Sequence, residues 1–259
     1  MGMRGAAILG LGYLGRPLAE KLFEQGFDVA AVKRRLTSDD VNLPITLDCV
    51  DLNQSETFQT ALWQQHWADK SLWFCLLPPS AVEDYVGIIR RWAALAQTAA
   101  VKHVVFGSSI SVYGDSVREC DEYSAPQPQT AGARNIVAAE KILLQSGIEN
   151  IDILRLGGLY SAGRHPLASL LKRTNISGAH RPVNMLHQDL AVAALYRAAA
   201  TPAGIRIRNI VEPQHLPKHE FYRREAAKLG LPEADFDMAD CSGGKTVNTV
   251  FNDFNIQAV

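Results

Sequence analysis

A glycine-rich turn close to the N-terminus has the spacing G-x-G-x-x-G, formed by Gly10, Gly12 and Gly15. In a dinucleotide-binding turn the first glycine permits a tight bend and the second leaves room for a pyrophosphate, while the third lets the following helix pack on the preceding strand. The free amides at the start of that helix then attract the phosphates. We therefore assign the three glycines, with Tyr13 and Leu14 between them, to a dinucleotide site.

Basic residues follow the next predicted strand, at residues 29–32: they are Lys33, Arg34 and Arg35. A site that selects NAD(H) usually has a carboxylate about 20 residues after the turn, which holds the ribose 2′-hydroxyl. Cations suit a 2′-phosphate instead, and arginine offers the best-matched fork of donors. We expect NADP(H) to be the preferred cofactor, with NAD(H) as the alternative, unless these residues form only a solvated loop.

Two more residues are expected beside the cofactor, because they follow or end strands of the same predicted sheet. Asp51 comes just after the third strand, at residues 45–49, where its side chain either contacts the adenine or caps the loop. Leu77 ends the fourth strand, at residues 72–77. Both positions lie at the carboxyl ends of strands, where ligands of open α/β sheets bind.

Alternating strand and helix patterns position these residues. Apolar segments typical of buried strands lie at residues 6–9, 29–32, 45–49, 72–77, 101–106, 151–154 and 205–211. Segments with helical spacing lie at residues 16–25, 55–67, 82–99, 131–145, 189–200 and 218–229. Apolar strands separated by amphipathic helices are typical of a parallel sheet that is covered on both faces. The sequence therefore predicts an α/β fold with a doubly wound, Rossmann-like parallel sheet.

The alternating pattern weakens after about residue 157, where glycine, proline, arginine and histidine become frequent. We predict a dinucleotide-binding domain at residues 1–156 and a small C-terminal substrate lobe at residues 157–259. The lobe would be interleaved with the last strand and helix of the sheet.

Composition argues against several classes of protein. The chain has 26 Lys and Arg against 27 Asp and Glu, a net charge of −1, whereas binding to nucleic acid needs a basic surplus. No apolar run approaches the roughly 20 residues of a membrane span. The chain begins without the pattern of a signal peptide, and its four cysteines are scattered, without a C-x-x-C pair. We expect a reduced, cytoplasmic protein with no metal site.

Four segments together resemble the NAD-dependent epimerase/dehydratase group, the extended branch of the short-chain dehydrogenase/reductase superfamily. The first is the glycine turn. Residues 104–114 resemble the group's SS-x-x-VYG segment, residues 152–160 its ILR-x-x-x-x-Y segment, and residues 186–191 its H-V-x-D-x-A segment. The resemblance implies an NAD(P)-dependent oxidoreductase or epimerase/dehydratase that acts on a carbonyl or hydroxyl group of a small, sugar-type substrate.

The chain departs from this group at the catalytic pair. The family's acid/base is a tyrosine, with a lysine four residues later on the same helix face. No such pair exists in the helix predicted at residues 131–145. One alignment places Gly132 and Ile136 at the two positions, and another places Thr130 and Arg134 there. We favour the second, which keeps polar groups at the site and lets Arg134 hold ribose hydroxyls of the cofactor.

Other residues are candidates for the remaining chemistry. Ser109 matches the family's hydroxyl that bonds to the reacting oxygen of the substrate, although it could simply cap a strand end. Tyr113 and Tyr160 are phenols that could replace the missing acid, although the first mostly packs beneath its loop in the family. Arg164 and His165 follow the sixth strand, so they are predicted to bind an anion or a hydroxyl.

Two hypotheses of different class follow. The first is an NADP(H)-dependent enzyme with a small-molecule substrate, which Ser109 and the Arg164 loop favour. The second is a catalytically silent NADP(H)-binding sensor or regulatory module, which the missing pair favours. The helices at residues 82–99 and 131–145 form a dimer interface in many relatives, so a homodimer is expected unless Ile89 and Trp92 belong to the core.

Overall fold

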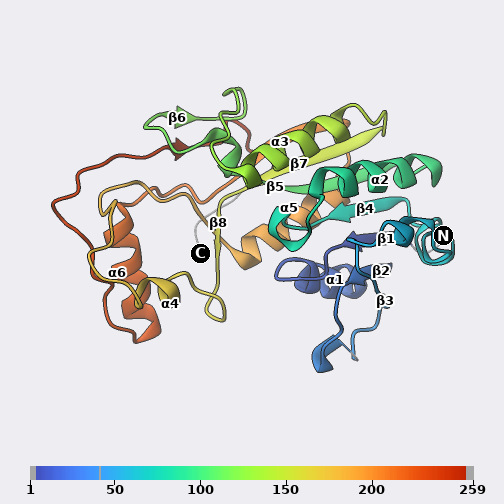
Figure 1. Ribbon diagram of the computed structural model, residues 1–259, viewed down its shortest axis with the longest axis horizontal. Coiled ribbons are helices and arrows are strands. Elements are labelled where there is room, and N and C mark those ends of the chain that lie inside the picture. The colour runs from blue at the N-terminus through green and yellow to red at the C-terminus, as the bar shows by residue number, and fades with distance from the viewer. Residues whose placement is uncertain (1–3, 41, 255–259) are drawn as a thin grey trace.

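The computed structural model describes residues 4–40 and 42–254. Its central sheet has seven parallel strands in the order β10-β7-β5-β4-β1-β2-β3 (Figure 1). The strands are β1 Arg4–Leu9, β2 Phe27–Lys33, β3 Thr46–Cys49, β4 Leu72–Cys75, β5 His103–Ser109, β7 Asn150–Leu156 and β10 Ile205–Ile210. The chain builds outward from β1 in one direction and then from β4 in the other. This confirms the doubly wound α/β fold and places a topological switch point between β1 and β4.

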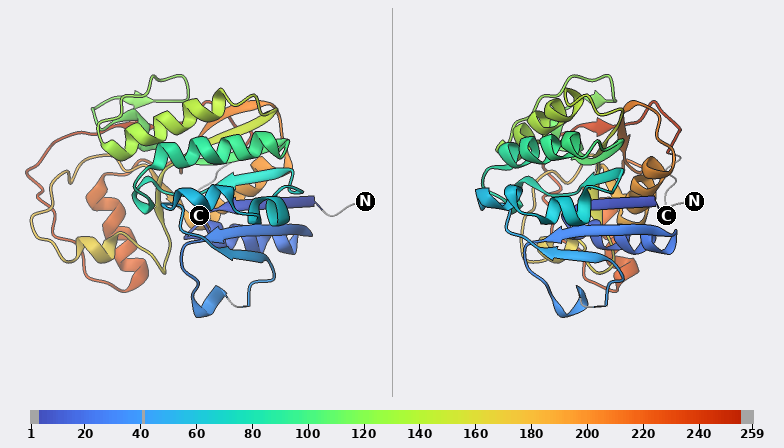
Figure 2. Two further views of the ribbon diagram at one scale, coloured as in Figure 1. Left: turned by 45° about the vertical axis from the view of Figure 1, so that its right-hand side comes forward. Right: turned by 90° about the vertical axis from the view of Figure 1, so that its right-hand side faces the viewer.

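Helices cover both faces of the sheet (Figure 2). On one face are α2 Tyr85–Thr98 and α3 Ala131–Leu144, and on the other are α1 Gly15–Glu24 and α5 Gln188–Ala200. One predicted helix, at residues 55–67, is wrong: the structure has two short turns there, Ser55–Gln59 and Trp63–Trp67. The indole Nε1 of Trp63 donates to the Thr57 carbonyl, so this carbonyl is not left for a continuous helical ladder.

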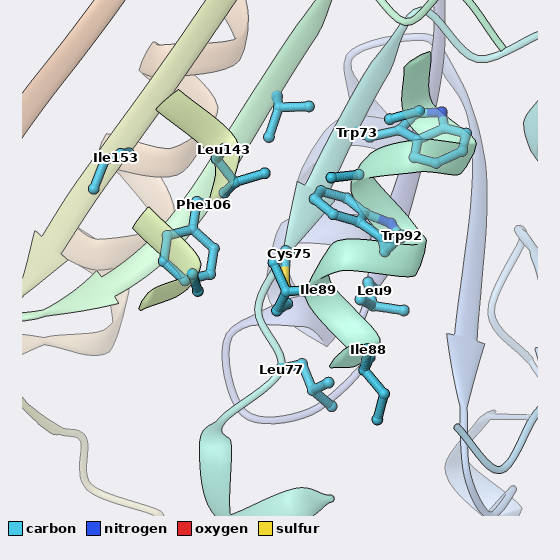
Figure 3. Close-up of a cluster of buried hydrophobic side chains, with 14 of the residues drawn as sticks. Leu9, Trp73, Cys75, Leu77, Ile88, Ile89, Trp92, Phe106, Leu143 and Ile153 are labelled. Atoms are coloured by element: carbon cyan, nitrogen blue, oxygen red, sulfur yellow. The ribbon is translucent and has the colours of Figure 1, made fainter. Parts of the chain in front are cut away.

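Two apolar cores lie on opposite faces of the sheet because neighbouring strand residues point in opposite directions. Leu9 of β1 faces α2 and α3, whereas Ile8 faces α1 and α5. Figure 3 shows the first core, where Ile89 and Trp92 of α2 lie against the strands. Both are fully buried, so they belong to the protein's own core. Cys75 is buried there too, which raises the pKa of its thiol to about 12 and fits a core role.

Part of the second half of the chain, around β8, α4 and α6, forms a lobe beside the sheet (Figure 1). Two small parallel strand pairs lie outside the central sheet: β8 Gly158–Tyr160 with β9 Met185–His187, and β6 Glu119–Cys120 with β11 Thr246–Val247. Helices α4 Leu167–Leu170 and α6 Lys218–Leu229 enclose a third apolar core. Because β8 follows β7 directly, the lobe lies beyond the carboxyl ends of the strands. In the part of the chain that the structure describes, no helix is long and apolar enough to span a membrane.

Candidate functional site

A cavity of about 750 Å³ opens at the switch point of the sheet. Its wall is built from segments that follow the strands: residues 10–14 after β1, 33–35 after β2, 50–52 after β3, 76–82 after β4, 107–109 at the end of β5, and 156, 157 and 159 around the end of β7. Ile136 of α3 and Arg164 of the lobe complete the wall. The cavity therefore lies where a doubly wound sheet binds its ligands.

Each of the three glycines in the turn meets different surroundings, which explains in a different way why a side chain is absent there. Gly10 has φ +102°, and a Cβ there would lie 3.0 Å from the Leu76 carbonyl carbon. A Cβ on Gly15 would clash with the carbonyl oxygen of Gly10, because the helix packs so closely on the strand. A Cβ on Gly12 would meet nothing within 4 Å. The fold itself needs the first and third glycines, whereas the second leaves open space on the cavity wall, which is where a pyrophosphate needs it.

Helix α1 presents its N-terminal end to this space. Its N-cap residue, Leu14, provides no side-chain cap. The Arg16 N–H donates to the Gly12 carbonyl oxygen at 3.0 Å and Pro17 has no N–H, so the amides of residues 13–15 are the ones left for a ligand. Tyr13 and Leu14 line the cavity as predicted. Uncapped amides and the helix dipole suit a phosphate group, so the residues present fit the pyrophosphate of a dinucleotide.

The basic loop lines the cavity, but its three cations are not equally available. Lys33 Nζ lies 2.6 Å from Asp40 Oδ2, in an ion pair that the sequence did not reveal. Arg34 Nη1 donates to the carbonyl oxygen of Ala81 at 3.3 Å, which joins the loops after β2 and β4. Arg35 is exposed and has no hydrogen-bond or ion-pair partner among the described residues. Two arginines therefore remain for an anion, one of them held by a single weak bond.

Asp51 and Leu77 also line the cavity. One oxygen of the Asp51 carboxylate accepts from the backbone N–H and the side-chain Nδ2 of Asn53, both at 3.1 Å. The residue thus stabilises its loop, as one of the two interpretations expected, and still presents its carboxylate to the cavity. Leu77 is 8% exposed and contributes an apolar wall.

Ser109 lies on the cavity wall at the end of β5. Its Oγ accepts from the Ser111 N–H at 3.1 Å and so caps the turn Ile110–Tyr113. Capping uses the oxygen as an acceptor and leaves the hydroxyl proton available for a ligand. The two interpretations of Ser109, a strand-end cap and a substrate-facing hydroxyl, are therefore compatible.

Tyr113 does not lie at the cavity, and its predicted role as the acid is wrong. The ring is fully buried. The hydroxyl lies 2.8 Å from the Asp121 carbonyl and 2.9 Å from Asn209 Oδ1, and it accepts from Arg155 Nη1 at 2.9 Å. Burial raises the pKa of this phenol. Tyr113 is part of a buried polar network that includes the ion pair of Arg155 with Glu140.

Tyr160 also lies away from the cavity, in the apolar core of the lobe. Its hydroxyl donates to Glu212 Oε2 at 3.3 Å, and burial raises the pKa of the phenol. His165 packs edge-on against this ring and accepts from the Leu167 N–H at 3.1 Å. The predicted catalytic role of Tyr160 and the predicted ligand-binding role of His165 are corrected accordingly.

Helix α3 carries both pairs of residues that could stand in place of the usual catalytic pair. Thr130 caps the helix, accepting from the Ala133 N–H at 3.1 Å, and exposed Arg134 donates to the Gln129 carbonyl at 3.0 Å. Neither lines the cavity, so the predicted contact of Arg134 with the cofactor is wrong. Ile136 lines the cavity, and Gly132 is one turn earlier on the same face. The structure therefore favours the other alignment, with Gly132 and Ile136 at the two positions.

The lobe reaches the glycine turn through Tyr13. The Tyr13 hydroxyl donates to Ser161 Oγ at 2.8 Å, and Gln188 Nε2 donates to the Tyr13 carbonyl oxygen at 2.6 Å. The guanidinium of Arg164 lies over the Tyr13 ring, 4.8 Å from its centroid, and Arg164 lines the cavity as its position after the sixth strand predicted. These contacts bring one cation from the lobe to the dinucleotide-binding turn.

The fold and this cavity define a Rossmann-like α/β protein with a ligand site at the switch point. The chain belongs to the NAD dependent epimerase/dehydratase family, whose model matches residues 6–189. A curated relative is the protein YeeZ of Escherichia coli strain K12, which is 28% identical over 260 residues, or 95% of this chain and 92% of YeeZ.

Solved structures share the fold. MoeE5 in complex with UDP-glucose and NAD has a TM-score of 0.78 at 21% identity, covering 96% of this chain and 90% of that one. UDP-glucuronic acid 4-epimerase from Bacillus cereus in complex with NAD has a TM-score of 0.77 at 14% identity, covering 94% of this chain and 89% of that one. Within the described residues, no group of three or more His, Cys, Asp or Glu side chains could hold a metal ion.

Proposed function

We propose that this protein binds NADP(H) and acts as an NAD(P)-dependent oxidoreductase or epimerase/dehydratase-like enzyme on a carbonyl or hydroxyl group of a small molecule. The observation that carries the proposal is one continuous cavity that extends from the basic loop, past the glycine turn, to Ser109. When bound, a nicotinamide cofactor supplies the donor or acceptor of a hydride.

The residues that would hold the cofactor all line this cavity. Arg34 and Arg35 would bind the 2′-phosphate, Asp51 would contact the adenine, and the amides of Tyr13 and Leu14 would bind the pyrophosphate. The cations of the loop support a preference for NADP(H) over NAD(H).

Ser109 would donate its hydroxyl proton in a hydrogen bond to the reacting oxygen of the substrate, where charge develops in the transition state. Gly132 and Ile136 supply neither the phenol nor the ammonium of the usual pair. Among the tyrosines that the structure describes, Tyr13 is the one that lines the cavity. In this proposal its phenol exchanges the proton, with Arg164 beside its ring.

The alternative, a catalytically silent NADP(H)-binding sensor or regulatory module, is favoured by one observation: the residue that α3 contributes to the cavity wall is an isoleucine, which cannot exchange a proton. The two hypotheses share the cofactor and differ in turnover. Binding of NADPH and NADH would be measured by fluorescence titration, with turnover of sugar nucleotides, aldehydes and ketones screened alongside. Absence of dinucleotide binding would refute both hypotheses, whereas binding without any turnover would favour the sensor.

Three expectations from the sequence stay predictions: the division at residue 157, the homodimer and the cytoplasmic location. The homodimer can be tested by light scattering of the purified chain. Since Ile89 and Trp92 are buried in the core, a dimer interface would have to use other side chains of α2 and α3.

A further inference from the structure

A buried carboxylate stands behind the basic loop, in the short turn Ser38–Asp40. Asp40 is 5% exposed. Its Oδ1 accepts from Arg16 Nη2 at 2.6 Å, and its Oδ2 accepts from Lys33 Nζ at 2.6 Å. The backbone N–H and the hydroxyl of Thr37 donate to the same Oδ2 at 2.7 and 2.8 Å. The hydrogen bond from Lys33, with those from Thr37, holds the pKa of the carboxyl well below its usual range, so it stays ionised at neutral pH.

This carboxylate changes the charge that the loop presents to a ligand. Lys33 lines the cavity, but its ammonium is already paired with a buried anion before a ligand arrives. A 2′-phosphate that approached Lys33 would also approach Asp40, and like charges at short range repel. A ribose 2′-hydroxyl carries no charge and meets no such repulsion.

Asp40 also joins two parts of the site. Arg16 directly follows the last glycine of the turn, whereas Lys33 ends β2. The one carboxylate pairs with both cations and so ties the start of α1 to the basic loop. The pairing gives Lys33 a defined position at the cavity wall.

We propose that Asp40 sets the cofactor preference of this protein, because it keeps Lys33 from binding a 2′-phosphate and leaves that contact to Arg34 and Arg35. The proposal rests on the dinucleotide site proposed above. Asp40 acts through Lys33, so it is a positioning residue that limits the preference for NADP(H) and allows NAD(H) to bind as well.

The test is Asp40→Asn, which keeps the shape of the side chain and removes its charge. We expect the affinity for NADPH to rise by about tenfold and the affinity for NADH to change by less than about twofold, because only the 2′-phosphate gains an unpaired ammonium. Fluorescence titrations with NADPH and NADH measure both. The matched control is Asp39→Asn in the same turn, since Asp39 is exposed and contacts Ser38 rather than the cations; its preference should equal that of the wild type.

A second arm separates this role from a purely structural one. In a Lys33→Gln background the change Asp40→Asn should give no gain in NADPH affinity, because no freed ammonium remains. The gain in the single variant should also shrink at high salt, which screens charge interactions. Asp40→Glu, which retains the charge, should restore the preference of the wild type.

The outcomes are distinguishable. If the folded Asp40→Asn variant shows an unchanged or lower ratio of NADPH to NADH affinity, or if the gain survives without Lys33, the proposal is overturned while the dinucleotide site stands. If the wild type binds neither dinucleotide, the proposed function fails and takes this inference with it. Asp40→Ser serves as a second neutral variant should the asparagine variant not fold.

Discussion

The two ends of the cavity are built from different kinds of side chain. The end at the glycine turn and the basic loop carries Lys33, Arg34, Arg35 and Asp51, together with the uncapped start of α1. The end at β5 and β7 has an apolar wall from residues 136, 156 and 159, with Ser108 and Ser109 beside it. The Ser108 hydroxyl donates to Glu140 Oε1 at 2.6 Å, which leaves that of Ser109 for a ligand. The first end has groups suited to a dinucleotide, whereas the second has neither a tyrosine nor a lysine among the residues that line it.

This difference shows that binding a cofactor and exchanging a proton have separate structural requirements. Dinucleotide binding depends on backbone amides and on loops at the ends of strands, which the fold itself positions. Proton exchange depends on two side chains on one face of α3, and both can be replaced without disturbing the helix. Helix α3 has no tyrosine with a lysine four residues later, and the glycine turn and the basic loop are nevertheless present.

The largest effect is expected at the binding end, from Gly12→Val. A Cβ at this position meets no protein atom within 4 Å, so folding should be retained. The valine side chain would instead fill the space proposed for the pyrophosphate. We expect the affinity for NADPH to fall by at least about 100-fold, as calorimetry would show, because charge-assisted phosphate contacts would be lost. Gly15→Ala is the contrasting variant, because its Cβ clashes with the Gly10 carbonyl and should lower the melting temperature. Normal binding by Gly12→Val would place the cofactor elsewhere.

Ser109→Ala tests the other end. We expect turnover to fall by about tenfold to a thousandfold, with NADPH affinity nearly intact, because this hydroxyl works mainly in the transition state. Thr130→Ala is the matched control, since each residue caps the turn or helix that follows it and Thr130 lies outside the cavity. Its turnover should be unchanged. Equal turnover of the two variants would remove Ser109 from the reaction.

Removal of the Arg35 side chain tests how the end of the cavity at the basic loop distinguishes NADPH from NADH. Arg35→Ala, and likewise Arg34→Ala, should weaken NADPH by ~1.5–3 kcal/mol and leave NADH almost unaffected, because each change removes charge-assisted bonds to the 2′-phosphate. Arg134→Ala provides the control, since its side chain is exposed outside the cavity. Fluorescence titration gives all the affinities. If wild-type protein bound NADPH and NADH equally, the 2′-phosphate contact would be refuted.

The smallest effect is expected from Tyr113→Phe, which sharpens the comparison at the catalytic end. Loss of a buried hydroxyl from its hydrogen-bond network should cost about 1–2 kcal/mol of unfolding free energy without changing turnover. Tyr13→Phe should instead lower turnover by about tenfold, as loss of a proton-exchanging group does. Denaturant unfolding and a rate assay measure the two effects. A slower Tyr113→Phe enzyme with unchanged Tyr13→Phe would reverse the assignment.

The strand pattern was predictable because burial on both faces demands apolar residues throughout a strand, and that demand is visible residue by residue. The turn was predictable for a similar reason, since Gly10 needs a positive φ and Gly15 needs close packing. The two turns at residues 55–67 were not predicted, because helical spacing of apolar residues does not reveal that the Trp63 indole donates to the Thr57 carbonyl within the segment.

The face of α3 shows the same limit within the site. Polarity suggested that Arg134 faces the cavity, but Ala133, Ala139 and Leu143 pack toward the sheet and fix the rotation of the helix. That rotation sends Arg134 to solvent and Ile136 to the cavity wall. Apolar burial over the whole helix outweighs the preference of one polar residue, since a fully buried leucine or isoleucine alone contributes about 1.5–3 kcal/mol.

The sequence by itself determined the order of strands and helices, the glycine turn and the cations beside it, because each depends on neighbouring residues. Only the tertiary structure decided which polar groups meet across the fold. Tyr113 joins Asn209 from 96 positions away, and Asp40 brings together Arg16 and Lys33, which no spacing signals. Ion pairs and hydrogen bonds act over a few ångströms in space, so their partners are chosen by packing rather than by position along the chain.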